Sequence, residues 1–143
     1  MSARSSPRSG RPVEATVLVV TDLFEWARNN QLRLEFGTGT EGRCWLQLDG
    51  GPEDVQFTFS IRTRGDVVVQ FQWMRDPFNT PESREALRQE ILEAVPTAEI
   101  PPDRINGRPP IPLRLLTDPD VRSAFLEAFT HQIARTRQAT EVP

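Results

Sequence analysis

The residues with the most recognisable chemical spacing are three glycines. The segment Gly37-Thr38-Gly39-Thr40-Glu41-Gly42 satisfies the pattern G-x-G-x-x-G and directly follows a predicted strand. In dinucleotide-binding proteins this pattern opens a helix whose N-terminus faces the pyrophosphate. Here the next residues, Arg43 to Leu48, alternate as another strand. The context therefore predicts a hairpin connection and not a phosphate-binding loop.

Cysteine and histidine each occur once. Cys44 has no partner for a disulfide or zinc site, and it falls on the apolar side of its predicted strand, so we expect an inert core thiol. His131 lacks a nameable partner for metal binding or proton transfer, and we expect a surface histidine on the final helix. An enzyme would instead need carboxylates such as Glu35, Glu41 or Asp54 to converge in a pocket.

All 17 basic residues are arginine. A nuclease of the Asp plus Glu-x-Lys kind needs a lysine beside its metal ligands, so this chain is a poor candidate for one. The net charge of -3 also argues against a strongly basic nucleic-acid-binding surface over the whole protein. We therefore expect a protein without catalytic residues, cofactor or bound metal.

The elements that must position any site follow from hydrophobic periodicity. Val13, Val17, Val20, Phe24 and Ala27 recur at helical spacing, although the β-branched run from Val17 to Val20 leaves a short strand as an alternative start. From Gln31 the period changes to two. Four successive strands are predicted, over Leu32–Phe36, Cys44–Leu48, Val55–Ile61 and Val67–Trp73, joined by turn-rich segments.

Two further helices have clear start signals. Thr80-Pro81-Glu82-Ser83 places a capping threonine before a first-turn proline, and Leu87, Ile91 and Val95 then form a stripe that ends before Pro96. Thr117-Asp118-Pro119-Asp120 starts the last helix, whose apolar spacing is the most regular in the chain. Both helices are expected on the apolar face of the sheet.

These elements predict an α+β fold: an N-terminal helix, a four-stranded antiparallel meander and two C-terminal helices packed on one sheet face. The chain of 143 residues is expected to hold one domain over residues 13–138. Residues 1–12 are predicted as a disordered tail rich in Arg, Ser and Pro, and residues 139–143 as a C-terminal tail. The apolar run at Val17 to Val20 is too short for a membrane span, and we expect a cytoplasmic protein.

The segment from Arg104 to Arg114 joins the last two helices and holds three arginines and three prolines. Pro109-Pro110-Ile111-Pro112-Leu113-Arg114 fits the polyproline ligand pattern P-x-x-P-x-basic. The structural interpretation is an extended crossing, which we call the strap, with Ile111 and Leu113 directed into the core. Its arginines either form a solvent-facing patch or pair with the acidic helix beside them.

Candidate binding residues fall into two sets. The first lies on the polar sheet face, which we expect to be solvated. The alternative is a binding surface, because these side chains carry hydrogen-bonding groups without charge. We expect the first helix to cover Trp45, although an exposed Trp45 on that face would be a contact for a partner. The members of this set are Trp45, Gln56, Thr58, Ser60, Gln70 and Gln72. The second set consists of the arginines of the hairpin tip and the strap: Arg62, Arg64, Arg75, Arg104, Arg108 and Arg114.

Several segments together resemble an uncharacterised bacterial α+β domain that occurs alone or appended to restriction-like and other DNA-processing proteins. The resemblance covers about Leu23 to Arg137 and is carried by Leu23–Arg28, Phe36-Gly37-x-Gly39, Val69–Trp73, Asp76-Pro77-Phe78, Arg84 and Arg108–Leu113. It implies an accessory role in prokaryotic defence or DNA handling, without an activity. The family has aromatic and lysine residues around the hairpin, where this chain has Gln72-Trp73-Met74-Arg75, and that departure weakens an inherited nucleic-acid contact.

Two functions remain open on the sequence alone. The first is a non-enzymatic accessory module that binds a protein partner or itself, within a bacterial DNA restriction or defence system. The second is a nucleic-acid-binding domain that uses the arginines of the hairpin tip and the strap, if these two segments converge. No membrane partner is expected.

Overall fold

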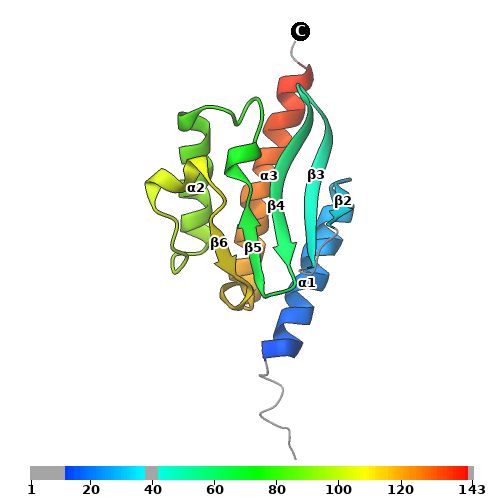
Figure 1. Cartoon of the computed structure of the whole chain (residues 1–143), viewed down its shortest axis with the longest axis vertical. Helices are drawn as coiled ribbons and strands as arrows, with labels where there is room; N and C mark the ends of the chain where they lie inside the picture. The colour runs from blue at the N-terminus through cyan, green and yellow to red at the C-terminus, as the bar shows by residue number, and fades with distance from the viewer. Residues whose placement is uncertain (1–11, 38–41, 142–143) are drawn as a thin grey trace, which may run out of the picture.

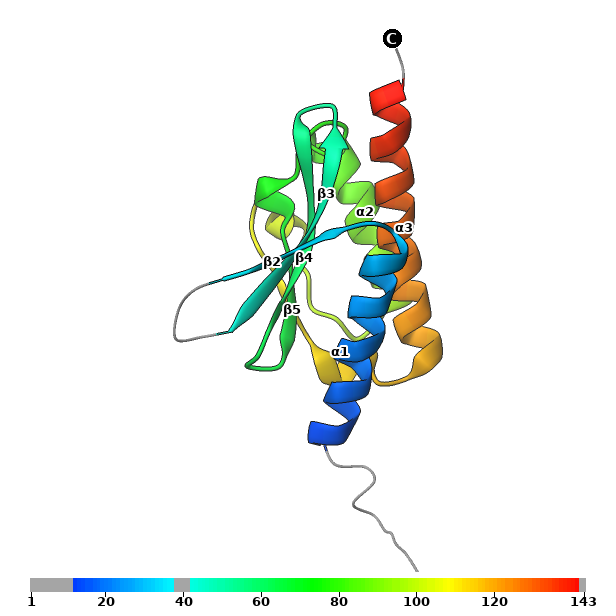
Figure 2. The same ribbon diagram turned by 90° about the vertical axis from the view of Figure 1, so that its right-hand side faces the viewer.

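The computed structural model describes residues 12–37 and 42–141 and has an α+β architecture with an antiparallel sheet, as predicted. Helices and strands follow in the order α1 (Pro12–Asn29), β2 (Arg33–Phe36), β3 (Arg43–Gly51), β4 (Asp54–Arg62), β5 (Asp66–Val69), α2 (Pro81–Ala94), β6 (Pro110–Pro112) and α3 (Pro119–Glu141). Three short 3-10 helices are η2 (Phe71–Trp73), η3 (Pro102–Asn106) and η4 (Leu113–Leu116). Figures 1 and 2 show α1, α2 and α3 on the same side of the sheet.

The helix starts confirm the capping signals. Thr80 caps α2: its hydroxyl accepts from the Ser83 backbone N–H (3.2 Å), and Pro81 occupies the first turn. Helix α1 is continuous from Pro12, so the alternative of a strand at Val17 to Val20 is wrong. Its buried residues Val19, Leu23 and Ala27 recur every four positions and supply the apolar stripe that a helix needs.

The core lies between the sheet and helices α1 and α3. Phe59 of β4 is fully buried, with its ring 4.9 Å from Phe129 and 5.4 Å from Phe125 of α3 (centroid to centroid). Trp26 of α1 stacks on the same ring at 5.8 Å, and its indole N–H donates to Thr130 Oγ1 at 2.9 Å. Aromatic burial therefore joins three elements on one face of the sheet. Helix α2 lies on that side too, and it packs chiefly against α3 and η3.

Within the described residues the sheet has five strands, in the order β2-β3-β4-β5-β6, where four were predicted. The predicted fourth strand ends early, because β5 stops at Val69 and Phe71–Trp73 turn as η2. The fifth strand comes from the strap, which pairs with β5 through Ile111 opposite Val67. Ile111 and Leu113 are buried as predicted. A three-residue strand flanked by prolines has no alternation to reveal it, and only its contact with β5 makes it a strand.

The structure departs from the predicted C-terminal tail over residues 139–141, which are helical, and residues 142–143 lie outside the described residues. Residues 1–11 of the predicted N-terminal tail lie outside the described residues, as do Thr38 to Glu41 of the glycine-rich connection. Helix α3 runs to Glu141, and the hydroxyl of Thr140 donates to the Gly50 carbonyl oxygen at 3.2 Å. This contact ties the end of α3 to the β3–β4 hairpin.

Candidate interaction face

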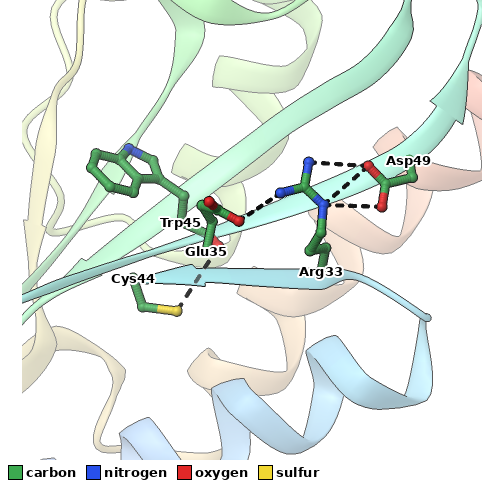
Figure 3. A network of polar contacts seen from close by, with 5 residues as sticks. All are labelled: Arg33, Glu35, Cys44, Trp45 and Asp49. Atoms are coloured by element: carbon green, nitrogen blue, oxygen red, sulfur yellow. Dashed lines mark hydrogen bonds and ion pairs between the residues drawn. The ribbon is translucent and has the colours of Figure 1, made fainter. Parts of the chain in front are cut away.

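The sheet face opposite the helices carries the side chains that are most distinctive for binding. Figure 3 shows Trp45 on one side of β3, together with Arg33, Glu35 and Asp49, while Cys44 points to the helix side. We call the side with Trp45 the open face. The expectation that the first helix covers Trp45 is wrong, since α1 lies on the other side of the sheet. The Trp45 ring instead lies over Gly37, so close that a Cβ atom added to this glycine would be 3.0 Å from the indole.

A β-bulge decides which residues of β4 belong to the open face. Trp45 pairs with Ser60, but Gln47 pairs with Phe57, so β4 has one extra residue in this interval. The bulge interrupts the simple alternation, and Phe57 lies beside the Arg75 guanidinium at 5.6 Å. Gln56 turns to the helix side, where its Nε2 lies 3.3 Å from Thr136 Oγ1 of α3.

The polar residues predicted for the solvated sheet face therefore do not form a solvated surface. Gln56, Thr58, Ser60 and Gln70 are 1%, 1%, 1% and 2% exposed. Hydrogen bonds offset most of this burial: Thr58 Oγ1 donates to the Leu46 carbonyl oxygen (2.6 Å), and Gln70 Nε2 donates to Ser60 Oγ (3.0 Å). Gln70 Oε1 is buried without a hydrogen-bond partner among the described residues. Polarity alone does not place a side chain in water when the fold supplies partners. Of the predicted amides, only Gln72 is exposed.

Gln56 has a structural role that sequence reasoning missed. Its Oε1 accepts from the Arg75 backbone N–H at 2.7 Å, and its Nε2 donates to the Arg75 carbonyl oxygen at 2.6 Å. The side chain thus behaves like a short strand partner for the segment after η2. This contact holds Arg75 close to the ring of Phe57.

Arginine and aromatic side chains form pairs on and beside the open face. The Arg43 guanidinium lies 5.4 Å from the Trp45 ring and that of Arg75 lies 5.6 Å from Phe57, both within the range of a cation–π contact. At the end of β5, the Gln72 side-chain oxygen accepts from Arg108 Nε (2.9 Å) and from Trp73 Nε1 (3.0 Å) in the amide orientation that satisfies both donors. Trp73 is 51% exposed.

The predicted arginines do not meet in one patch. Leu113 N–H donates to the Gly65 carbonyl oxygen (2.9 Å), so the strap does converge with the β4–β5 hairpin tip, and this brings the backbones of Arg64 and Arg114 together. Arg62 at that tip is bound bidentately by Asp66, at 2.7 Å for both bonds. Arg108 lies at the opposite end of β5, where Gln72 N–H bonds to Gly107. Arg104 is exposed on η3.

Carboxylates neutralise much of the remaining open face. Arg33 Nε donates to Asp49 (3.1 Å), and its Nη1 donates to Glu35 (2.6 Å), as Figure 3 shows. The hydrogen bond that Arg33 donates to Asp49 raises the pKa of Arg33, and the negative charges of Asp49 and Glu35 add to the effect. The face is therefore mixed in charge and not uniformly basic.

Cys44 and His131 lack the surroundings that catalysis would need, and Glu41 lies outside the described residues. Burial raises the pKa of Cys44 to about 11, so the thiol stays protonated near neutral pH and is a poor nucleophile. His131 is exposed, as predicted, and contacts Glu90 and Glu127 between α2 and α3. Among residues 12–37 and 42–141, no group of three or more His, Cys, Asp or Glu residues is placed to hold a metal ion.

Two arginines of α2, buried Arg88 and half-buried Arg84, were not singled out from the sequence as structural residues. Arg84 donates to the carbonyl oxygens of Phe78 (2.8 Å) and Met74 (2.9 Å), and desolvation lowers its pKa. Arg88 donates to the Ile100 carbonyl oxygen at 2.7 Å. They join α2 to the segments before and after it. Their helical spacing of four was the available signal, since it places both on the side of α2 that carries Leu87 and Ile91.

An apolar pocket of about 420 Å³ lies between α1 and one end of β2, β3 and β4. Its wall includes Val20 and Phe24 of α1, Phe36 of β2, Cys44 and Ile61. Phe36 is 66% exposed, and its ring is 6.5 Å from that of Phe24. Edge strand β2 therefore exposes apolar surface on its helix side.

Comparison with known proteins adds no relative. No family description, curated protein or solved structure matches this chain. Within the described part of the chain, no helix is long and apolar enough to cross a membrane.

Proposed function

We propose that this protein is a non-enzymatic interaction module that binds a protein partner through the open face. The observation that carries the proposal is the placement of all three helices on one side of the sheet, which leaves Trp45 and Phe57 with their arginine neighbours on the other. Tryptophan and arginine are the residues most enriched at the energetic centres of protein interfaces. Exposed Trp73 at the margin extends this surface.

The charge pattern favours a protein over a nucleic acid. Arg33 and Arg62 are bound to carboxylates on this sheet, and binding of phosphates would have to compete with those carboxylates. A surface of alternating signs gives specificity for a partner with complementary charges. The link to a DNA restriction or defence system, implied by the sequence resemblance, is part of the proposal, and the identity of the captured partner tests it.

Site-specific photocrosslinking in the source cell tests the face directly. A photoreactive phenylalanine analogue replaces Phe57 or Trp73 in two variants, and Glu93 or Ala134 on the exposed sides of α2 and α3 in two controls. We expect a discrete crosslinked protein at the first two positions only. Equal crosslinking at all four positions, or crosslinking at the helix positions alone, would contradict the proposal.

Nucleic-acid binding is the second candidate, favoured by the two arginine–aromatic pairs, because unstacked bases also pack on such groups. Fluorescence titration with single-stranded and duplex DNA and RNA at low and moderate salt separates the two functions. Affinity that falls steeply with salt and is lost in Trp45→Ala would favour the nucleic acid. Absence of binding at low salt removes this candidate.

A further inference from the structure

The two edges of the sheet differ in the backbone groups that they present. In an antiparallel pair, alternate residues direct N–H and C=O groups toward the neighbouring strand. Gly37 N–H donates to the Arg43 carbonyl oxygen (2.8 Å), and the register pairs Glu35 with Trp45 and Arg33 with Gln47. These residues therefore face β3, and Leu34 and Phe36 direct their backbone groups outward.

The outer side of β2 is unpaired among the described residues, since β2 ends the strand order. On β6, the same reasoning gives a different result. Val69 N–H bonds to Pro109 and Leu113 N–H bonds to Gly65, so Ile111 faces β5 and the outward positions are Pro110 and Pro112. Proline has no N–H, and these prolines block the addition of a strand to β6. The chain protects one edge and leaves hydrogen-bonding groups on the other.

We propose that two copies of this chain pair through β2 as antiparallel strands, with Leu34 on the two-fold axis. This register exchanges the outward N–H and C=O groups of Leu34 between the copies. It also places Arg33 opposite Glu35 of the second copy, twice. Their side chains are 41% and 53% exposed, so each is accessible to the other copy. Opposite charges in directly facing positions stabilise a strand pair, and this strand is self-complementary.

The competing register has Glu35 on the two-fold axis. Between residues of β2 alone it would form more backbone hydrogen bonds, because Leu34 of each copy would pair with Phe36 of the other. It would also place two Glu35 carboxylates directly opposite, which is destabilising. The charges of β2 thus favour the first register.

Exposed Phe36 supplies the apolar part of the interface. Its side chain is 66% exposed on the helix side of β2, beside Phe24. In the proposed register Phe36 lies opposite Leu32 of the second copy, where its ring loses contact with water. The strand has only four residues, so the contact is small and the dimer is expected to dissociate on dilution.

Disulfide trapping tests the position of the axis. In a Cys44→Ala background, Leu34→Cys places the new cysteine opposite itself at a Cα separation of about 5.5 Å, which suits a disulfide. We expect Leu34→Cys to form covalent dimers at least tenfold faster than Glu35→Cys and than Gln138→Cys, a control on exposed α3. Trapping at position 34 that is no faster than at position 138 overturns the dimer, and fastest trapping at position 35 overturns the register.

Charge reversal tests the self-complementarity independently. Light scattering of the full chain should show a mass that rises with concentration toward twice that of the monomer. In an Asp49→Asn background, which removes the other carboxylate bonded to Arg33, Glu35→Arg should abolish this rise, and the double change Arg33→Glu with Glu35→Arg should restore it. A monomer at all concentrations, or a double variant no better than Glu35→Arg, overturns the proposal, with circular dichroism confirming that each variant is folded. Both assays measure self-association of the purified chain and not capture of a partner protein, so they fail independently of the proposed function.

Discussion

Strands β6 and β2 occupy equivalent places at opposite edges of one sheet, yet their sequences treat these places differently. On β6, the inward residue Ile111 is fully buried, and both outward residues are prolines. On β2, the side chains of Arg33, Glu35 and Phe36 are exposed, and every residue retains an N–H. An edge strand can therefore contribute to the core and resist pairing at once, because its side-chain face and its backbone edge are separate surfaces.

The largest expected effect comes from removing the buried residue of β6. Ile111→Ala should lower the free energy of unfolding by about 2–5 kcal/mol, because the fully buried side chain leaves a cavity between sheet and helices. Phe36→Ala on the other edge should change it by less than about 0.5 kcal/mol for the monomer. Urea denaturation at low protein concentration measures both. Equal losses would mean that β2 also supports the core.

Unblocking β6 should make the two edges alike. Replacing Pro110 and Pro112 by threonine adds two outward backbone N–H groups to β6 and keeps its pairing with β5. We expect concentration-dependent association above that of the native chain, seen as a larger mass in light scattering. The Pro110→Thr single variant, which adds only one outward N–H group, is the control and should associate less than the double variant. An unaltered mass in the double variant would show that something other than proline protects this edge.

Blocking β2 is the reciprocal change. Leu34→Pro removes the outward N–H without removing a bond to β3, and Leu34→Ala shortens the same side chain but keeps the N–H. Proline should therefore abolish self-association, and alanine should retain it. Sedimentation velocity over a range of concentrations distinguishes them. Loss of association in both variants would assign the effect to the leucine side chain.

The smallest expected effect concerns Cys44, which pairs with Phe36 beneath the β2 edge. Burial raises the pKa of this thiol from 9.0 to about 11, so the folded chain holds its proton more tightly than the unfolded chain. The resulting stability is fully present below pH 9 and is lost as pH rises toward 11. Native protein should therefore lose stability over this interval more steeply than Cys44→Ala. Parallel pH dependences of the two proteins in chemical denaturation would contradict the shifted pKa.

Local signals in the sequence were sufficient for the helices and for most of the meander. Thr80-Pro81 and Asp118-Pro119 act through groups within a few residues, so a capping residue carries its meaning without the rest of the fold. The open face could not be obtained in this way. The alternation of β4 predicted Gln56 beside Ser60, and the bulge between Phe57 and Ser60 reversed that placement.

The sequence by itself determined the order and type of the three helices and of the strands β2 to β5, the burial of Ile111 and Leu113, and the absence of lysine. Tertiary structure alone decided that the strap pairs with β5, that Gln56, Ser60 and Gln70 are buried, and that Trp45 lies on the face opposite α1, α2 and α3. The physical reason is the range of the interactions. Propensity and capping act over a few residues, whereas strand register, sheet edges and the pairing of an arginine with its carboxylate depend on segments brought together only by folding.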